Sequence, residues 1–232
     1  MLTPRDRKVV IHLGFHGWLT HNQLQRLEFP SYQTLQGRIR KELMPVASNH
    51  DKKKVDYIER KYYVDEKGNQ IPVFRLSKKG KRLFKKDTGQ GAIRPRFSQL
   101  KMEHRLTVNE VIIWLKTHYL IAIHAFELEK KFGSVRADAF VHYDIPFAIE
   151  VDMSNERRDF ICKKWKQYER EYMQGNMENC RYVVWYSNRS QQLYNWIEIN
   201  SQLEPIFISA ESDNIQKVID YVNPESKLKA IK

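Results

Sequence analysis

Three carboxylates lie close together in a stretch of the chain that otherwise has the pattern of two apolar strands. Asp138 follows an apolar segment, and Glu150 and Asp152 alternate with apolar residues in the run 146–153 (PFAIEVDM). Because the strand period is two residues, Glu150 and Asp152 share one face, and strands about 4.8 Å apart can bring Asp138 beside Glu150. Three clustered anions repel one another unless a cation neutralises them. The spacing therefore predicts a site for Mg²⁺ or Mn²⁺, which prefer oxygen ligands.

A second interpretation of these carboxylates needs no metal. Arg136 shares the face of Asp138 and can pair with it, and Asp152 can pair with a lysine, which would make them ion pairs at strand ends. A bound divalent cation would supply an activated water and stabilise charge on a phosphate, so the metal interpretation implies phosphodiester hydrolysis. The ion-pair interpretation implies a scaffold.

The elements that must position these residues follow from hydrophobic periodicity. A long helix is expected over residues 99–117, and a charged helix over about 155–174. Apolar runs predict strands at 120–128, 135–143, 146–153, 180–187 and 205–210, with a further helix at 191–199. The order predicts an α/β fold with a central mixed sheet.

This order resembles the core of the PD-(D/E)xK nuclease superfamily, that is, a restriction-endonuclease-like α/β domain. Asp138 and Glu150 match its two acidic positions, whereas Asp152 occupies the place of its lysine. In some members the following helix supplies the lysine, which the resemblance assigns here to Lys164. It also makes Glu110, on the long helix, a candidate fourth ligand. The resemblance implies catalytic roles for Asp138, Glu150, Asp152 and Lys164.

Aromatic residues accompany Lys164 on the same predicted helix. Lys164, Tyr168 and Tyr172 are spaced by four residues and so lie along one face. Trp165 and the two tyrosines can stack on unpaired bases or pack in the core, and core packing is the interpretation that the pattern favours.

The positive charge of the chain is concentrated at its N-terminal end. Residues 1–96 hold 22 Lys and Arg against 9 Asp and Glu, whereas residues 97–232 hold 18 against 19. A basic module joined to a neutral one is typical of a protein that binds a polyanion through one of two domains.

Capping signals divide the basic module into short helices. Thr3-Pro4 begins the first, Thr20 with Gln23 forms a capping box at the second, and Pro30-Ser31 begins the third, where Leu35, Ile39 and Leu43 recur every four residues. Two strand-like runs then flank the turn at 65–69, and Ser77 caps a fourth helix.

Three helices followed by a hairpin is the order of a winged helix-turn-helix, which predicts that the third helix enters the major groove of double-stranded DNA. Three-helix modules also serve as protein-docking domains, but the charge favours DNA. The candidate DNA-binding residues are Gln33, Thr34, Gln36, Arg38, Arg40, Lys41, Lys52, Lys53 and Lys54.

The predicted organisation is a winged helix at 1–88, a linker at 89–98 and the nuclease-like domain at 99–232. Most of the chain resembles the replication-relaxation family of plasmids and integrative elements. The resemblance rests on short motifs in the family's order, among them Arg136-Ala137-Asp138-Ala139, Glu150-Val151-Asp152, and Lys164 with Tyr168. Ala137 replaces the family's usual proline.

The sequence thus leads to two hypotheses about function. In the first, the protein binds DNA in the replication or transfer of a mobile element and acts as a metal-dependent nuclease or nickase. In the second, it is a non-enzymatic initiator or transcriptional regulator whose second domain forms a homodimer. The absence of an apolar stretch long enough for a membrane span, together with two distant cysteines, predicts a cytoplasmic protein.

Overall fold

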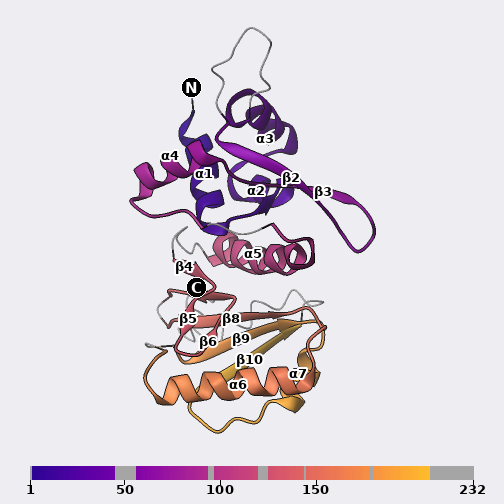
Figure 1. Cartoon of the computed structure of the whole chain (residues 1–232), viewed down its shortest axis with the longest axis vertical. Coiled ribbons are helices and arrows are strands. Elements are labelled where there is room, and N and C mark those ends of the chain that lie inside the picture. The colour runs from indigo at the N-terminus through magenta and orange to yellow at the C-terminus, as the bar shows by residue number, and fades with distance from the viewer. Residues whose placement is uncertain are drawn as a thin grey trace, which may run out of the picture. The chain divides into compact units, whose positions relative to one another are not determined.

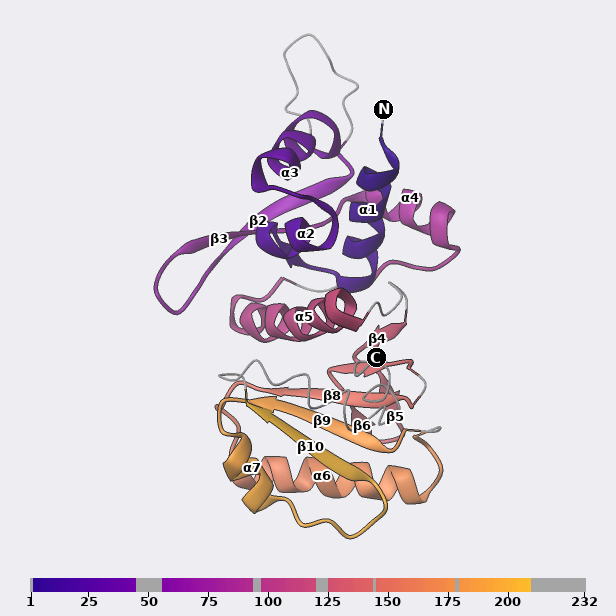
Figure 2. The ribbon, with the colours of Figure 1, turned by 180° about the vertical axis from the view of Figure 1, so that it is seen from behind.

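The computed structural model describes residues 2–44, 56–93, 97–119, 125–143, 145–177 and 180–209. The chain has a mixed α+β fold that divides into two compact units, Met1–Leu120 and Ile121–Lys232 (Figures 1 and 2). The division falls after the long helix, so this helix belongs with the basic module rather than with the sheet domain.

The first unit begins with short helices whose starts are the predicted ones. They are α1 (Pro4–His16), α2 (His21–Glu28), α3 (Tyr32–Arg38) and a π-helical turn, η1 (Ile39–Leu43). The side chains of Thr3, Thr20 and Ser31 accept hydrogen bonds from the first turns of these helices, and Thr3 and Thr20 form full capping boxes. The turn η1 keeps Leu35, Ile39 and Leu43 buried in one core, as their spacing predicted.

A hairpin and two further helices complete this unit. Strands β2 (Ile58–Val64) and β3 (Gln70–Leu76) form the hairpin, and β1 (Leu19–Thr20) pairs with β3 to give a three-stranded sheet. Ser77 caps α4 (Lys78–Thr88), and the long helix is α5 (Gln99–Tyr119).

Helix α5 is joined to the short helices by buried polar contacts. The Asn109 amide donates to the Trp18 carbonyl at 2.6 Å, and its Oδ1 lies 3.1 Å from His16 Nδ1. The Gln23 amide donates to the Leu106 carbonyl at 2.9 Å. Because buried polar groups are costly without partners, these contacts fix how α5 lies on α1 and α2.

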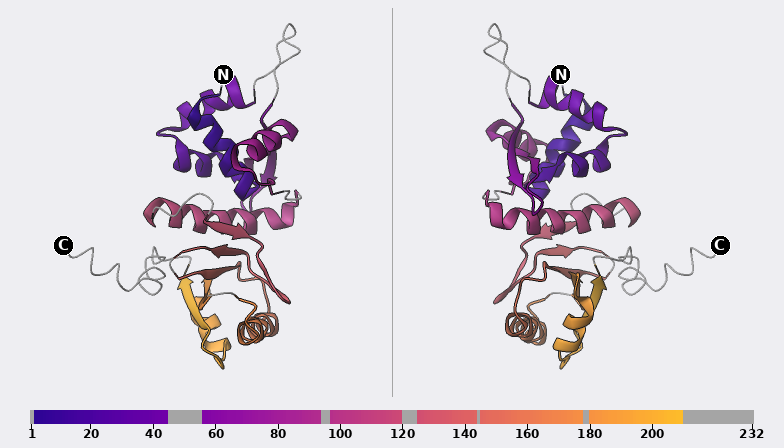
Figure 3. Two further views of the ribbon diagram at one scale, coloured as in Figure 1. Left: turned by 90° about the vertical axis from the view of Figure 1, so that its left-hand side faces the viewer. Right: turned by 90° about the vertical axis from the view of Figure 1, so that its right-hand side faces the viewer.

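The second unit is built on a five-stranded mixed sheet with the order β10-β9-β8-β7-β4. Figure 3 shows the ribbon from two further sides. Its strands are β4 (Phe126–Leu128), β7 (Ala139–Val141), β8 (Phe147–Asp152), β9 (Tyr182–Ser187) and β10 (Glu204–Ser209). Strands β8, β9 and β10 are parallel, whereas β7 pairs antiparallel with both β4 and β8.

The single strand predicted over residues 135–143 is in fact two strands. Its first part, β6 (Val135–Arg136), pairs with β5 (Lys131–Phe132) in a separate ribbon, and β7 enters the main sheet only after Asp138. Periodicity could not reveal the break, because the apolar alternation continues through it.

Two helices pack on the sheet, as Figure 1 shows. Helix α6 (Arg158–Met173) turns Ile161, Trp165 and Tyr168 inward, and these side chains meet Phe140 and Val183 of the sheet in one buried cluster. The shorter α7 (Ser190–Trp196) follows β9. Trp165 and Tyr168 are therefore core residues, as the sequence pattern favoured. No described helix is long and apolar enough to span a membrane.

Two histidines of α1 are buried in the first unit, and this makes the stability of the unit sensitive to acid. Burial lowers the pKa of His12 to about 4 and that of His16 to about 3. His12 Nε2 lies 2.7 Å from Glu28 Oε1 and 3.0 Å from Lys116 Nζ. Both rings are thus held neutral at pH values where an unfolded chain would already have protonated them.

We expect stability to be fully present above pH 7 and to fall as the pH drops from 6.5 towards 4, because only the unfolded chain binds protons in this window. At pH 5, each histidine should lower the free energy of unfolding by about 2 kcal/mol relative to its value above pH 7. Chemical denaturation of the wild type and His12→Gln at pH 7.5, 6 and 5 measures the effect, and the variant should lose less stability on acidification. Parallel declines in the two proteins would contradict the assignment.

Candidate carboxylate site and nucleic-acid interface

Strands β7 and β8 bring Asp138 and Glu150 side by side. Ala139 pairs with Ile149 across these strands, so Asp138 lies opposite Glu150 just before β7 begins. The Asp138 carboxylate accepts a hydrogen bond from the Val151 N–H at 2.9 Å, which ties it to the C-terminal end of β8. The predicted juxtaposition of these two carboxylates is thus present.

Helix α6 supplies two partners for Glu150. The Glu150 carboxylate is only 2% exposed. One of its oxygens accepts a hydrogen bond from the Lys164 ammonium, and the other accepts one from the Tyr168 hydroxyl. Lys164 and Tyr168 are four residues apart and therefore project from one side of the helix. The sequence pattern placed Lys164 and Tyr168 on one helix face, and both side chains contact Glu150 from that face.

Burial raises the pKa of Glu150, and the neighbouring charge of Asp138 adds to the rise, whereas the Lys164 ammonium and the hydrogen bonds from Lys164 and Tyr168 lower it and favour the ionised carboxylate. Burial by itself would lower the pKa of Lys164, but the charges of Glu150 and Asp138 outweigh it and raise that pKa. The pKa of Tyr168 is raised well above its usual value, chiefly by burial. Lys164 is therefore the charged partner, and Tyr168 remains a hydrogen-bond donor.

Asp152 has a different set of partners, although it lies on the same strand as Glu150. It is 5% exposed, and its carboxylate accepts hydrogen bonds from Arg189 Nε at 2.8 Å, from the second Arg189 nitrogen at 2.9 Å and from the Ser187 hydroxyl at 2.6 Å. The Arg189 guanidinium also lies over the Trp196 ring, 5.0 Å from its centroid. These contacts neutralise Asp152 within the fold.

The other predicted partners of the cluster are engaged elsewhere. Arg136 pairs with Glu129 at 3.8 Å. In the first unit, Glu110 forms an ion pair with Arg26 and accepts a hydrogen bond from the Gln23 amide at 3.2 Å. Among the described residues, no three His, Cys, Asp or Glu side chains come together as a metal ligand set. The donor set available to a hard cation at this place is the pair Asp138 and Glu150.

The roles of Arg189 and Ser187 in the site were not found from sequence. Ser187 ends β9 opposite Asp152, and Arg189 lies in the turn after that strand. A turn residue carries no periodic signal, and its contact with Asp152 depends on the parallel pairing of β8 and β9. The contact of Tyr168, by contrast, could be anticipated, because its spacing of four residues from Lys164 predicted that the two side chains share one helix face.

The candidate DNA-binding residues of the first unit divide into exposed and engaged side chains. Gln33, Thr34, Arg40 and Lys41 are exposed, and Gln36 is half-buried. Arg38 instead donates two hydrogen bonds to the buried carboxylate of Asp6, which also belongs to the capping box of α1. Lys52, Lys53 and Lys54 lie outside the described residues.

The hairpin adds a second exposed surface to this unit. Tyr62 and Val64 on β2 are exposed, and the Arg60 guanidinium lies 5.3 Å from the centroid of the Tyr62 ring. Arg60, Lys61 and Lys67 contribute positive charge to the hairpin.

The fold and these sites define a two-unit α+β protein with a basic helical module and a sheet module that contains a lysine-paired carboxylate. The chain belongs to the replication-relaxation family, whose model matches residues 11–184. No curated protein and no solved structure matches it. Membership associates the chain with the replication or relaxation of a plasmid or similar element.

The partners of Asp152 lead to a test of whether this residue is structural. Asp152→Asn should lower the free energy of unfolding by about 3 kcal/mol, because it leaves the largely buried Arg189 without its counterion. Asp159→Asn is the matched control, since its pair with Arg157 is largely exposed and its loss should leave stability almost unchanged. Equal effects in denaturant titrations, or a more stable Asp152→Asn variant, would contradict this role.

Proposed function

We propose that this protein binds double-stranded DNA through its first unit, as a winged helix, in the replication or transfer of a mobile element. The observation that carries the proposal is the exposed polar and basic face formed by α3 and η1. Gln33, Thr34, Arg40 and Lys41 present hydrogen-bonding groups and charge on one short segment, within the part of the chain that holds all the excess positive charge. Such side chains serve both phosphate contacts and base-edge contacts.

Arg38 has a supporting role in this proposal. Burial alone would raise the pKa of Asp6, but hydrogen bonds from Arg38 and Thr3 outweigh burial and lower it. The ionised Asp6 therefore needs Arg38, and the pair fixes the end of α3 against the first turn of α1. Arg38 positions the face, and Arg40 and Lys41 contact the DNA.

A second candidate function, phosphodiester hydrolysis in the second unit, is favoured by the contact of Lys164 with Glu150 beside Asp138. Asp138 and Glu150 would hold Mg²⁺ or Mn²⁺, and such an ion supplies an activated water and charge stabilisation when bound. Lys164 would then turn from Glu150 towards a phosphate oxygen. Tyr168 is buried and its pKa is raised, so it orients Glu150 and is unsuited to attack phosphorus as a nucleophile.

The alternative to hydrolysis is a regulator or initiator without enzymatic activity, whose second unit is a dimerisation scaffold. In that case Lys164 is the permanent counterion of Glu150, and Asp138 is fixed by the Val151 N–H. Hydrolysis requires that Asp138 and Glu150 bind a divalent metal ion, whereas the scaffold alternative does not. The second experiment below tests this difference.

For DNA binding, we expect Arg40→Ala/Lys41→Ala to weaken affinity for a short duplex by about 1–3 kcal/mol per lost base contact. If about six phosphates are contacted, log K of the wild type should fall against log salt with a slope near −5, and the variant should have a shallower slope. Lys85→Ala/Lys86→Ala removes the same charge from α4 and is the control. Equal losses in the two variants would mean that charge alone, and not this face, determines binding.

For hydrolysis, calorimetric titration should detect Mn²⁺ binding that Asp138→Asn and Glu150→Gln abolish, because each removes one of two anionic ligands. Asp152→Asn should retain the binding, since Asp152 is neutralised by Arg189. A nicking assay on supercoiled plasmid with Mn²⁺ gives the activity. Mn²⁺ binding that survives Glu150→Gln, or no binding by the wild type, would leave the non-enzymatic alternative.

A further inference from the structure

Helix α4 concentrates positive charge on one side of the first unit. Six of its 11 residues are lysine or arginine. Its one carboxylate, Asp87, accepts hydrogen bonds of 2.8 and 2.9 Å from Arg7 of α1. The exposed cations of the helix recur every three or four residues, so they form one stripe, here called the α4 stripe, which consists of Lys78, Arg82, Lys85 and Lys86.

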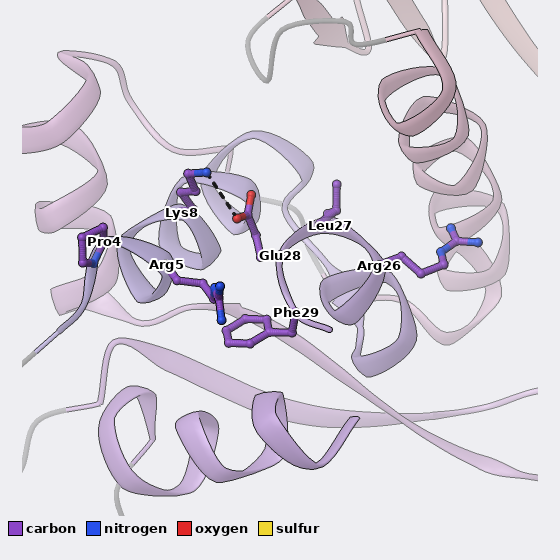
Figure 4. Close-up of a pocket in the computed structure, with 7 residues that line it drawn as sticks. All are labelled: Pro4, Arg5, Lys8, Arg26, Leu27, Glu28 and Phe29. Carbon is purple, nitrogen blue, oxygen red and sulfur yellow. Dashed lines mark ion pairs between the residues drawn. The ribbon is translucent and has the colours of Figure 1, made fainter. Parts of the chain in front are cut away.

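The cations of α1 and α2 differ from this stripe because they have partners. Figure 4 shows Lys8 beside Glu28, with 3.6 Å between Nζ and Oε2, and Arg26 directed away from both of them towards α5, with which it pairs. Arg5 lies over the Phe29 ring, 5.6 Å from its centroid. Among the residues that the structure describes, no carboxylate forms an ion pair with the α4 stripe. Its charge is therefore available to an external anion.

This arrangement of charge is unfavourable for the helix itself. The first turn of α4 has no acidic residue and contains Lys78 and Lys79, although the N-terminal end of a helix favours negative charge. Arg82 is four residues from both Lys78 and Lys86, and like charges at this spacing repel one another. A bound polyanion would relieve both effects.

Close packing on the other side of α4 fixes the direction of the stripe. A Cβ atom on Gly80 would lie 2.0 Å from the Tyr57 carbonyl oxygen, and one on Gly14 of α1 would lie 2.1 Å from the Phe84 ring. The helix therefore lies directly against both backbones, with Phe84 buried. Because such contacts leave no room for rotation, the stripe is held facing solvent.

The α4 stripe lies on a different flank of the unit from the proposed duplex face. Asp6 of α1 binds Arg38 at the end of α3, whereas the next residue, Arg7, binds Asp87 at the end of α4. Successive residues of a helix point about 100° apart. Helices α3 and α4 therefore pack on different sides of α1, and Figures 1 and 2 show α1 between them.

The length of the stripe suits the backbone of DNA. From Lys78 to Lys86 the helix rises about 12 Å. One strand of B-DNA carries a phosphate about every 3.4 Å along the axis, so about three or four phosphates can lie along the stripe.

We propose that the α4 stripe binds the phosphates of a second DNA duplex, so that one molecule holds two duplex segments, one on α3 and η1 and the other on α4. This inference rests on the proposed binding of the first duplex by α3 and η1. The contact is with phosphates alone, so the second segment is bound without regard to its sequence.

The test is the capture of a second duplex by the full chain. A short duplex fixed to beads is loaded with protein, and a fluorescent duplex of another sequence is added. Wild type should retain the fluorescent duplex, and Arg82→Gln/Lys86→Gln should retain about tenfold less of it, with the same amount of protein on the beads. The matched control, Lys163→Gln/Lys166→Gln, removes two exposed charges from α6 and should capture within about twofold of wild type.

Thermal melts without DNA give a second readout. Arg82→Gln/Lys86→Gln should be as stable as wild type or more stable, because the repulsion along the stripe is reduced. A lower melting temperature would mean that these cations have structural partners, and would overturn the proposal.

The capture experiment has several outcomes that overturn the proposal. Capture by Arg82→Gln/Lys86→Gln at the wild-type level would mean that a homodimer bridges through two α3 faces. Loss of the first duplex from this variant would make α4 part of a single interface. Wild-type beads that hold protein but no fluorescent duplex would exclude a second DNA surface, and displacement by polyglutamate of equal charge would assign the stripe to an acidic protein segment. Beads that hold no protein would remove the proposed function itself.

Discussion

The second unit depends on the neutralisation of a carboxylate placed in the middle of a buried strand. All six residues of β8 are buried, and Glu150 is one of them. An ionised carboxylate at such a position is too costly to leave unpaired, so its partners must come from whatever packs on the sheet. Helix α6 supplies Lys164 and Tyr168, and this requirement sets the rotation of the helix. The same rotation turns Ile161 and Trp165 onto the sheet, which couples the polar contact to the apolar core.

A similar constraint joins α5 to the first unit. His16, Gln23 and Asn109 are buried polar residues, and each has a hydrogen-bond partner across the boundary between α5 and the helices before it. The helix order alone suggested that α5 begins the sheet domain, as in the nuclease superfamily. Because buried amides and imidazoles need specific partners, the hydrogen bonds decide the association, and the basic module includes α5.

The local elements were largely predictable from sequence, whereas the pairing of side chains was not. Thr3, Thr20, Ser31 and Ser77 identified four helix starts, because capping is a local interaction between a side chain and the next turn. The adjacency of Asp138 and Glu150 also followed from strand spacing. The partners of Arg38 and Asp152 did not, since the contact of Arg38 with Asp6 spans 32 residues and that of Asp152 with Arg189 spans 37. Such contacts depend on tertiary packing.

Glu150 and Asp152 are two residues apart on one strand, yet their charges are balanced by different kinds of cationic side chain. Arg189 binds Asp152 through two nitrogens and is itself supported by Trp196, so a competing ligand would have to break a bidentate pair. Glu150 is neutralised by one ammonium on a flexible stem, and the Lys164 side chain is 26% exposed. A lysine can exchange one anion for another by rotating its side chain, whereas a stacked arginine fork cannot do so without losing several contacts. Of these two carboxylates of β8, Glu150 is therefore the one whose cationic partner can be exchanged for another ligand.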